Sequence, residues 1–200
     1  MKNNEKNYPL LESIDNLQNP HHSMLLYEKP QYAQIVKSRY VQNGLKKGEH
    51  SICFTHDDVK YIEEELASGG LDVDYFKRKN LLHIYQIENI MEHKDGLKKG
   101  FEELFKTMTA EAKPPYRFIG RTIPDVSTRQ GILASLEIEH FFHSHFDDYQ
   151  SSSAVCTYNV KDIEENKRSV WLGQLCDNHH NLIYAVEPES AVAFDSDLIK

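Results

Sequence analysis

The segment His56–Asp58 places a histidine and two aspartates together, directly after the apolar run SICFT. An imidazole beside a carboxylate can act as a general base, or it can supply half of a metal site. The alternative is structural, because an aspartate at the start of a helix accepts backbone amide hydrogen bonds and suits the helix dipole. We favour this capping role for Asp57 or Asp58, and the two roles are compatible.

A second group of ionisable side chains lies in EIEHFFHSH, residues 137–145. Glu139 and His143 are four residues apart and His140 and His143 are three apart, so each pair shares one face of a helix. The order differs from the HExxH pattern of zinc hydrolases, and nothing fixes a third ligand. We therefore predict no metal site and no cofactor. His140 and His143 are weak candidate ligands, and we expect them to face solvent or another subunit.

The remaining histidines and the cysteines carry little signal for chemistry. Four histidines form adjacent pairs in expected loops, namely His21, His22, His179 and His180. The three cysteines are Cys53, Cys156 and Cys176. They are far apart, which suits reduced core thiols better than a disulfide framework or a CxxC zinc site. The sequence contains no GxSxG nucleophile elbow, and we assign no catalytic residue.

Short apolar runs alternate with longer amphipathic segments along most of the chain. The runs expected to form strands are SMLLY, SICFT, LLHIYQI, YRFIG, SSAVCTY and LIYAV, and the last of these ends at Glu187 and Pro188. Strands that alternate with helices of this length need crossover connections, and therefore a mostly parallel sheet with helices on both faces. The predicted fold is α/β, with three α-β-α layers.

In a sheet of this kind, ligands bind outside the carboxyl ends of the strands, where loops and helix N-termini converge. We therefore expect the ligand at this edge of the sheet. The candidate ligand-binding residues, which include one glutamate of the long helix after YRFIG, are Tyr27, Glu28, His56, Asp57, Arg121, Glu139 and Tyr158. The residues that follow the strands are rich in acids, so an anionic nucleotide would find few cations there.

Length and charge limit the class of protein. The chain has 200 residues, which suits one domain with a substantial core. We expect a partly flexible N-terminal extension over residues 1–20 and a single domain over residues 21–200. The net charge of -8 disfavours direct nucleic-acid binding, which depends on clustered lysine and arginine. No apolar stretch is long enough to span a membrane and the N-terminus lacks a signal-peptide core, so we expect a cytoplasmic protein with no membrane association.

Several motifs occur in a recognisable order over roughly residues 21–190, namely HHSMLLYE, YVQNGLKKGEHSICFT, LDVDYFKRKNLLHIY, ILASLEIEHFF, AVCTYNV and HHNLIYAV. In this order the chain resembles the MEDS domain, a family named for methanogen and methylotroph proteins and for the sensory domain of the dichloromethane-responsive regulator DcmR. The most specific parts are the NGLKKGE turn and the cysteine and tyrosine of VCTY.

The MEDS family is similar to the RecA/KaiC ATPases, in which a comparable turn joins the first helix to the second strand. A Walker A loop would read GxxxxGK followed by Ser or Thr after the first strand, whereas this chain has Glu28 and Pro30 there. The resemblance implies a RecA/KaiC-like fold whose Walker A loop is lost, and it disfavours ATP hydrolysis. Arg121 is a departure, because the family usually has an acidic residue after the glycine that ends its fourth strand.

The resemblance also implies a sensing role directed at small organic compounds. Our first hypothesis is a non-catalytic small-molecule sensing module in signal transduction or transcriptional regulation. Its output would need a protein partner such as a kinase or regulator, or self-association as a homodimer. The second hypothesis is a protein-interaction scaffold derived from an ATPase. The third is a metal-assisted enzyme that uses His56 and Asp57.

Overall fold

The structure is a computed structural model that describes residues 14, 15, 17, 20–149, 152–163, 165–187 and 190–195. Its strands are β1 (His21–Tyr27), β2 (His50–Thr55), β3 (Leu82–Gln86), β4 (Tyr116–Gly120), β5 (Ser153–Asn159), β6 (Asn181–Glu187) and β7 (Ser190–Asp195). Its helices are α2 (Pro30–Lys47), α3 (Val59–Ser68), α4 (Val73–Arg78), α5 (Leu97–Thr109), α6 (Arg129–Ser144) and α7 (Glu165–Cys176). Short 3-10 turns η1 (Ile90–Glu92), η2 (Phe146–Tyr149) and η3 (Val160–Asp162) complete the order.

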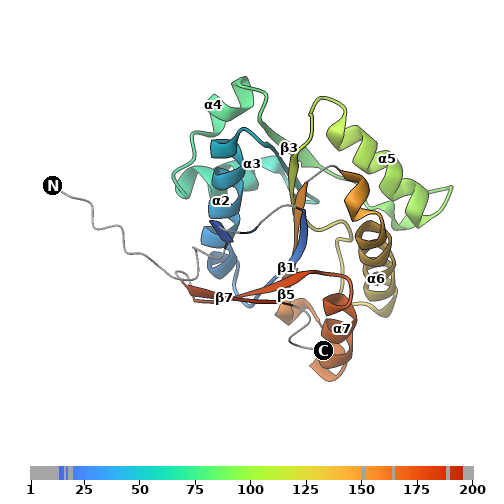
Figure 1. Ribbon diagram of the computed structural model, residues 1–200. Helices are drawn as coiled ribbons and strands as arrows, with labels where there is room; N and C mark the ends of the chain where they lie inside the picture. The colour runs from blue at the N-terminus through green and yellow to red at the C-terminus, as the bar shows by residue number, and fades with distance from the viewer. Residues whose placement is uncertain are drawn as a thin grey trace.

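The strands form one seven-stranded sheet in the order β3-β2-β4-β5-β1-β6-β7. The pairs from β3 to β6 are parallel, and β7 runs antiparallel to β6. Figure 1 shows α2, α3 and α4 on one side of the sheet and α5, α6 and α7 on the other. The predicted α/β fold with three layers and a mostly parallel sheet is confirmed.

The prediction that LIYAV is the last strand is wrong. The chain returns along β6 as β7, with Ile183 opposite Ala193. A proline after a strand interrupts that strand but does not end the sheet, because an antiparallel neighbour needs only a short connection. The apolar run AVAF was therefore a strand signal that the proline obscured.

Alternation along the strands divides the core into two faces. Residues such as Leu25, Cys53 and Ile119 pack against α2 and α3, in one cluster. Ile52, Phe54 and Phe118 point to the opposite face, where they meet the aromatic side chains of α5 and α6. Near the far end of that face, β1 and β5 meet Trp171 of α7. Both faces of the central strands are buried, as in other parallel sheets.

The NGLKKGE turn is held by a buried ion pair between the end of α2 and β4. Gly48 has a φ of 78°, and its N–H donates to the Leu45 carbonyl at 3.1 Å, which closes α2. The next residue, Glu49, accepts a hydrogen bond from Arg117 Nε at 2.6 Å. Gly44 leaves room for this arginine, because a Cβ there would lie 2.4 Å from Arg117 Cδ. The two glycines and the glutamate of this motif thus share one structural role.

Most of the expected N-terminal extension lies outside the described residues, namely 1–13, 16, 18 and 19. Ile14 is buried in the core beside α2. Asp15 accepts a hydrogen bond from Arg39 Nε at 2.8 Å. The part of the extension that the structure describes is therefore attached to the domain. None of the described helices is both long and apolar enough to cross a membrane.

A histidine pair at the β2–β3 edge predicts a pH dependence of folding. His50 Nδ1 lies 3.1 Å from His83 Nε2. Burial lowers the pKa of both side chains below the ordinary value, and the neighbouring His50 lowers that of His83 further, despite the opposing charge of Glu111. Below about pH 6.5 the unfolded chain takes up protons that the folded chain resists, so the free energy of unfolding falls as pH falls.

We expect His83→Gln to flatten this pH dependence, because glutamine keeps a polar side chain at the position but does not titrate. Urea unfolding at a series of pH values from about 7.5 down to about 5.5 measures the slope. A slope equal to that of the unmodified chain would show that the pair does not contribute.

Candidate functional site

A cavity of about 320 Å³ opens at the carboxyl edge of the sheet, between β1, β2 and β4 and the helices α2 and α3. Its walls are formed by Tyr27, Lys37, Val41, Cys53, Phe54, Thr55, His56, Asp57, Tyr61, Ile62, Glu65, Leu66, Ile119, Gly120, Arg121, Pro124 and Thr157. This is the edge at which the sequence predicted a ligand. The volume is at the small end of the range for sites that hold small organic molecules, roughly 300–1,000 Å³.

The floor of the cavity is apolar and uncharged. Val41 from α2, Leu66 from α3 and Ile119 from β4 are buried there. Cys53 of β2 is also buried, and burial raises the pKa of its thiol to about 12. The thiol is therefore neutral near neutral pH, and it contributes to the floor as a small apolar group.

The two cationic side chains of the cavity are already paired. Lys37 Nζ lies 3.2 Å from Glu65 Oε1, and both side chains are about a fifth exposed. Arg121 Nη1 lies 3.4 Å from Asp162 Oδ2, and its Nη2 donates to the Pro124 carbonyl at 2.5 Å. With these partners in place, neither cation offers an anionic ligand an unopposed charge.

His56 holds the loops at the cavity mouth rather than pairing with a carboxylate. Its Nδ1 lies 3.1 Å from the Ile87 carbonyl and its Nε2 lies 3.0 Å from the Thr122 carbonyl. Burial lowers its pKa, although these carbonyls act in the opposite direction. Asp58 caps α3, because its Oδ1 accepts from the Lys60 N–H at 3.0 Å. The capping interpretation of this segment is thus confirmed for Asp58.

The connection between β1 and α2 consists of Glu28 and Lys29. Helix α2 begins at Pro30 without a side-chain cap. Glu28 is directed to β6, where its Oε1 accepts from the Tyr184 hydroxyl at 3.0 Å. A phosphate-binding loop needs several backbone N–H groups turned toward one point, and a two-residue connection followed by proline cannot supply them.

The structure brings four of the seven predicted ligand-binding residues to this cavity, namely Tyr27, His56, Asp57 and Arg121. Glu28 lies outside it, against Tyr184. Tyr158 is on the opposite face of the sheet, because its neighbour Thr157 lines the cavity and successive side chains of a strand alternate. Glu139 also lies on that opposite face, in α6. The prediction placed Tyr158 on the same rim as the other residues that follow strands, and the alternation of β5 explains why it is absent from the cavity.

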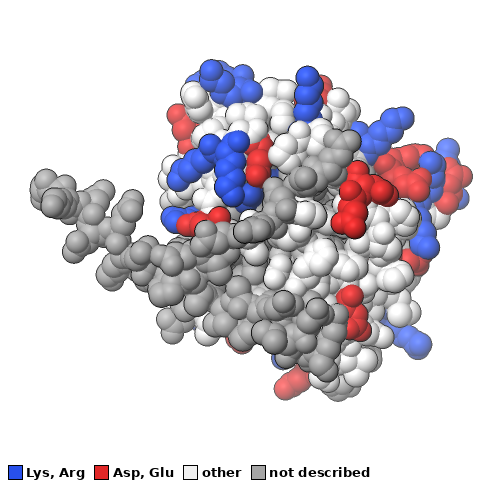
Figure 2. All heavy atoms as spheres, in the orientation of Figure 1, with Lys and Arg blue, Asp and Glu red and all other residues white. Residues whose placement is uncertain are grey.

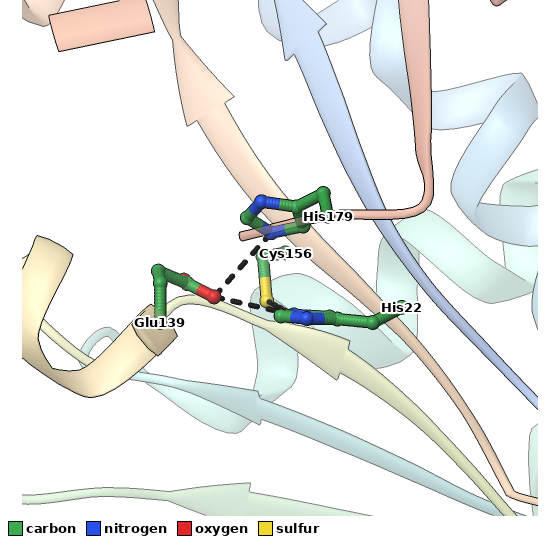
Figure 3. A group of neighbouring side chains, drawn as sticks. All are labelled: His22, Glu139, Cys156 and His179. Carbon is green, nitrogen blue, oxygen red and sulfur yellow. Dashed lines mark hydrogen bonds and ion pairs between the residues drawn. The ribbon is translucent and has the colours of Figure 1, made fainter. Parts of the chain in front are cut away.

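Glu139 belongs to a buried cluster with His22, Cys156 and His179 (Figure 3). His22 Nε2 lies 3.2 Å from Cys156 Sγ and 3.2 Å from Glu139 Oε2. His179 Nε2 lies 3.3 Å from the same Glu139 oxygen. Figure 3 shows the four side chains pointing toward one another from β1, α6, β5 and the loop after α7.

The surroundings of this cluster shift the pKa values of its members. Burial lowers the pKa of His22 to about 3, with a further contribution from His179. Burial alone would raise the pKa of Glu139, but the imidazoles of His179 and His22 outweigh it and hold the pKa well below the ordinary value. Burial and the nearby Glu139 raise the pKa of the Cys156 thiol and of the Tyr158 hydroxyl. The cluster therefore combines a carboxylate with a neutral thiol, and the neutral phenol of Tyr158 lies next to it.

Sequence reasoning missed three members of this cluster. His22 and His179 were interpreted as loop histidines, and Cys156 as a core thiol. The sequence did contain a signal for the cluster. Glu139 shares a helix face with Ser135 and Phe142, and a glutamate buried on such a face needs polar partners from other segments. The weak candidates are not among these four residues. His140 is exposed, and its Nδ1 lies 3.1 Å from Asn178 Oδ1. His143 is half-buried next to the cluster rather than facing solvent, because its ring lies 5.8 Å from that of His22 and 4.7 Å from that of His180.

A second group of possible ligands among the described residues is at the surface. It consists of His93, Asp95 and Glu103, of which the two acids are exposed. His93 Nε2 lies 3.4 Å from Glu103 Oε2. Exposed acids next to a histidine are common on protein surfaces, so this group carries no argument for a bound ion.

A comparison with protein-family descriptions matches residues 21–179 to the methanogen/methylotroph, DcmR sensory domain, MEDS. The chain belongs to the MEDS family. The matched region runs from the first residue of β1 to the last histidine of the buried cluster, so it includes both the cavity and the cluster. A comparison with curated protein sequences gives no significant match.

The MEDS fold of this chain is similar to that of a KaiC-like protein from the hyperthermophilic archaeon Pyrococcus horikoshii OT3. The TM-score is 0.60 at 12% sequence identity, and the match covers 88% of this chain and 90% of that chain. An identity this low supports the shared fold alone. The predicted RecA/KaiC-like architecture is thereby confirmed.

Proposed function

We propose that this MEDS protein is a non-catalytic, cytoplasmic sensing module that binds a small, neutral organic compound in the cavity at the carboxyl edge of the sheet. Family membership supports a sensing role. The observation that supports the cavity is its composition, an apolar floor with both of its cations already paired. Such a site favours a compound that fills apolar space and makes a few hydrogen bonds.

The same observations support a role without catalysis and without ATP. The RecA/KaiC-like layers are present, but the β1–α2 connection carries Glu28 and Pro30 in place of a glycine-rich loop. A triphosphate there would meet a carboxylate and few free N–H groups. The metal-assisted enzyme is less well supported, because both nitrogens of His56 face backbone carbonyls and Asp57 does not orient the ring.

The output of such a module requires another protein or a second copy of the chain. Figure 2 shows short groups of basic side chains next to acidic ones on the face in view, without a continuous basic surface. Together with a net charge of -8, this supports a protein partner, such as a kinase or a regulator, rather than direct contact with nucleic acid. A binding event affects such a partner only if the ligand prefers one of two conformations or assembly states.

A thermal-shift screen of small neutral organic compounds, with ATP and Mg²⁺ in parallel, tests the proposal. We expect at least one neutral compound to raise the melting temperature in a concentration-dependent way, because a ligand that binds only the folded state stabilises it by mass action. ATP with Mg²⁺ should produce no shift. A shift by ATP at low concentration would contradict the proposal.

Two tryptophan variants of α3 locate the bound compound. Ile62→Trp adds bulk to the cavity wall and should abolish the shift. Lys60→Trp adds the same side chain at an exposed position of the same helix and should keep it. If both variants respond as the unmodified chain does, the compound binds elsewhere. If no compound binds and the protein is a stable dimer, the scaffold hypothesis gains support.

A further inference from the structure

We propose that His22, Glu139, Cys156 and His179 form a closed site for one divalent transition-metal ion, for which Zn²⁺ is the best chemical match. The site lies inside the domain, between α6 and the sheet, on the face opposite the sensing cavity. It shares no residue with the walls of the sensing cavity, and it is not a site for an exchangeable small molecule.

The distances within the cluster fit tetrahedral coordination. Ligand atoms at roughly 2.0–2.3 Å from a tetrahedral zinc ion lie about 3.3–3.6 Å from one another. The distances from His22 Nε2 to Cys156 Sγ and to Glu139 Oε2 are both 3.2 Å, and that from His179 Nε2 to Glu139 Oε2 is 3.3 Å. All four ligand atoms lie within 4.8 Å of one another. Three of the six distances between ligand atoms are therefore close to the tetrahedral values, and the other three do not exceed 4.8 Å.

Two of the converging atoms are buried without a hydrogen-bond partner, although they are close together. Glu139 Oε2 and His179 Nε2 are 3.3 Å apart, yet neither makes a hydrogen bond of acceptable geometry. Buried polar atoms of this kind are costly, and each requires an explanation. A metal ion at a shared centre satisfies lone pairs that point toward that centre and do not lie along an N–H···O axis.

Neighbouring groups orient the ligands as an outer shell does in metal sites. His179 Nδ1 donates to the Leu175 carbonyl at 2.8 Å, which leaves its Nε2 for the cluster. The Tyr158 hydroxyl donates to Glu139 Oε1, and Ser135 Oγ lies 3.2 Å from that hydroxyl. These contacts engage one carboxylate oxygen and turn the other, Oε2, to the centre.

Aromatic side chains keep the site dry. The His22 ring stacks on Phe146 with a centroid distance of 5.5 Å and meets the edge of Phe142 at 4.9 Å. All four proposed ligands are buried. Two imidazoles, a thiolate and a carboxylate are all groups that zinc binds, and four ligands from the chain leave no open position, as in closed structural sites. On binding, the Cys156 thiol releases its proton to solvent as the sulfur–metal bond forms.

Metal analysis of the full, untagged chain tests the proposal. After purification without chelators, incubation with Zn²⁺ and dialysis against metal-free buffer, we expect about one zinc per chain. Cys156→Ser should lower the zinc affinity by more than about 100-fold, since even outer-shell changes cost 10–100-fold. Cys53→Ser is the matched control, because Cys53 is a buried thiol on the other face of the sheet and should retain the metal.

Cobalt provides a readout that does not depend on the zinc count. The Co²⁺ form should show a thiolate-to-cobalt charge-transfer band that persists in Cys53→Ser and is absent in Cys156→Ser. Tyr158→Phe keeps all four ligands and removes one outer hydrogen bond, so it should weaken metal binding by about 10–100-fold. This milder variant also tests the site if Cys156→Ser fails to fold.

Three results would overturn the proposal. They are an unmodified chain that retains no zinc, a cobalt spectrum without the thiolate band, and equal metal affinities in Cys156→Ser and Cys53→Ser. None of these results bears on the sensing cavity, which the Ile62→Trp and Lys60→Trp pair tests separately.

Discussion

Arg117→Met is expected to destabilise the folded protein by about 3–5 kcal/mol, because it removes the guanidinium that pairs with the buried carboxylate of Glu49. Arg117 is 1% exposed, and its Nε donates to Glu49 Oε2 at 2.6 Å. Its Nη1 also donates to the Tyr40 carbonyl at 3.1 Å, and its guanidinium lies 4.6 Å from the centre of the Tyr40 ring. The variant therefore removes several contacts that join α2 to β4. Urea unfolding measures the change.

The double variant Arg117→Met/Glu49→Leu separates two effects, the loss of the ion pair and the cost of a buried Glu49 charge that no longer faces Arg117. Replacing both partners with apolar side chains should restore much of the stability, because no uncompensated charge then stays buried. Lys77→Met is a control in an exposed ion pair, in which Lys77 Nζ lies 2.6 Å from Glu63 Oε1. It should cost no more than about 1 kcal/mol. A loss for Arg117→Met as small as that control would contradict the role given to the pair.

Trp171→Ala is expected to cost roughly 3–5 kcal/mol, since a large buried ring is removed and a cavity remains. Trp171 of α7 is 2% exposed. Its ring meets that of Tyr158 edge-on at a centroid distance of 5.1 Å, and it packs with Ile163 and Leu175. The ring is thus one of the contacts by which α7 covers β5.

The adjacent residue supplies a matched control for this change. Val170→Ala alters the same helix, but Val170 is 67% exposed, and we expect a change within about 0.5 kcal/mol. Trp171→Phe keeps most of the packing and should lose less than the alanine variant. Equal unfolding free energies for Trp171→Ala and Val170→Ala would show that α7 does not depend on this ring.

The layers of the fold were predictable because their signals are local. Apolar runs such as SMLLY and SICFT are short, carry no charge and are separated by segments with helical spacing, and parallel strands buried on both faces have this appearance. The edge strand β7 was not predicted, because Pro188 follows β6 and a proline at that place predicts the end of the sheet. The pairing of one strand with another depends on tertiary contacts, and a local sequence pattern does not contain these contacts.

The candidate sites were predictable only in part, for a related reason. The carboxyl edge of the sheet follows from topology, so Tyr27, His56 and Arg121 were found. The buried cluster draws one residue from each of four segments between positions 22 and 179, and no short spacing connects them. A local search for metal motifs therefore selected His140 and His143, which are close in sequence, and passed over Cys156.

The alternation of β5 has a mechanical consequence. Thr157 forms part of the cavity wall, while Cys156 and Tyr158, on either side of it, reach into the opposite face. One thickness of backbone is all that separates the two compartments. A displacement of this segment of β5 toward one compartment would move it away from the other. The position of β5 therefore affects the shape of the cavity and of the buried cluster at the same time.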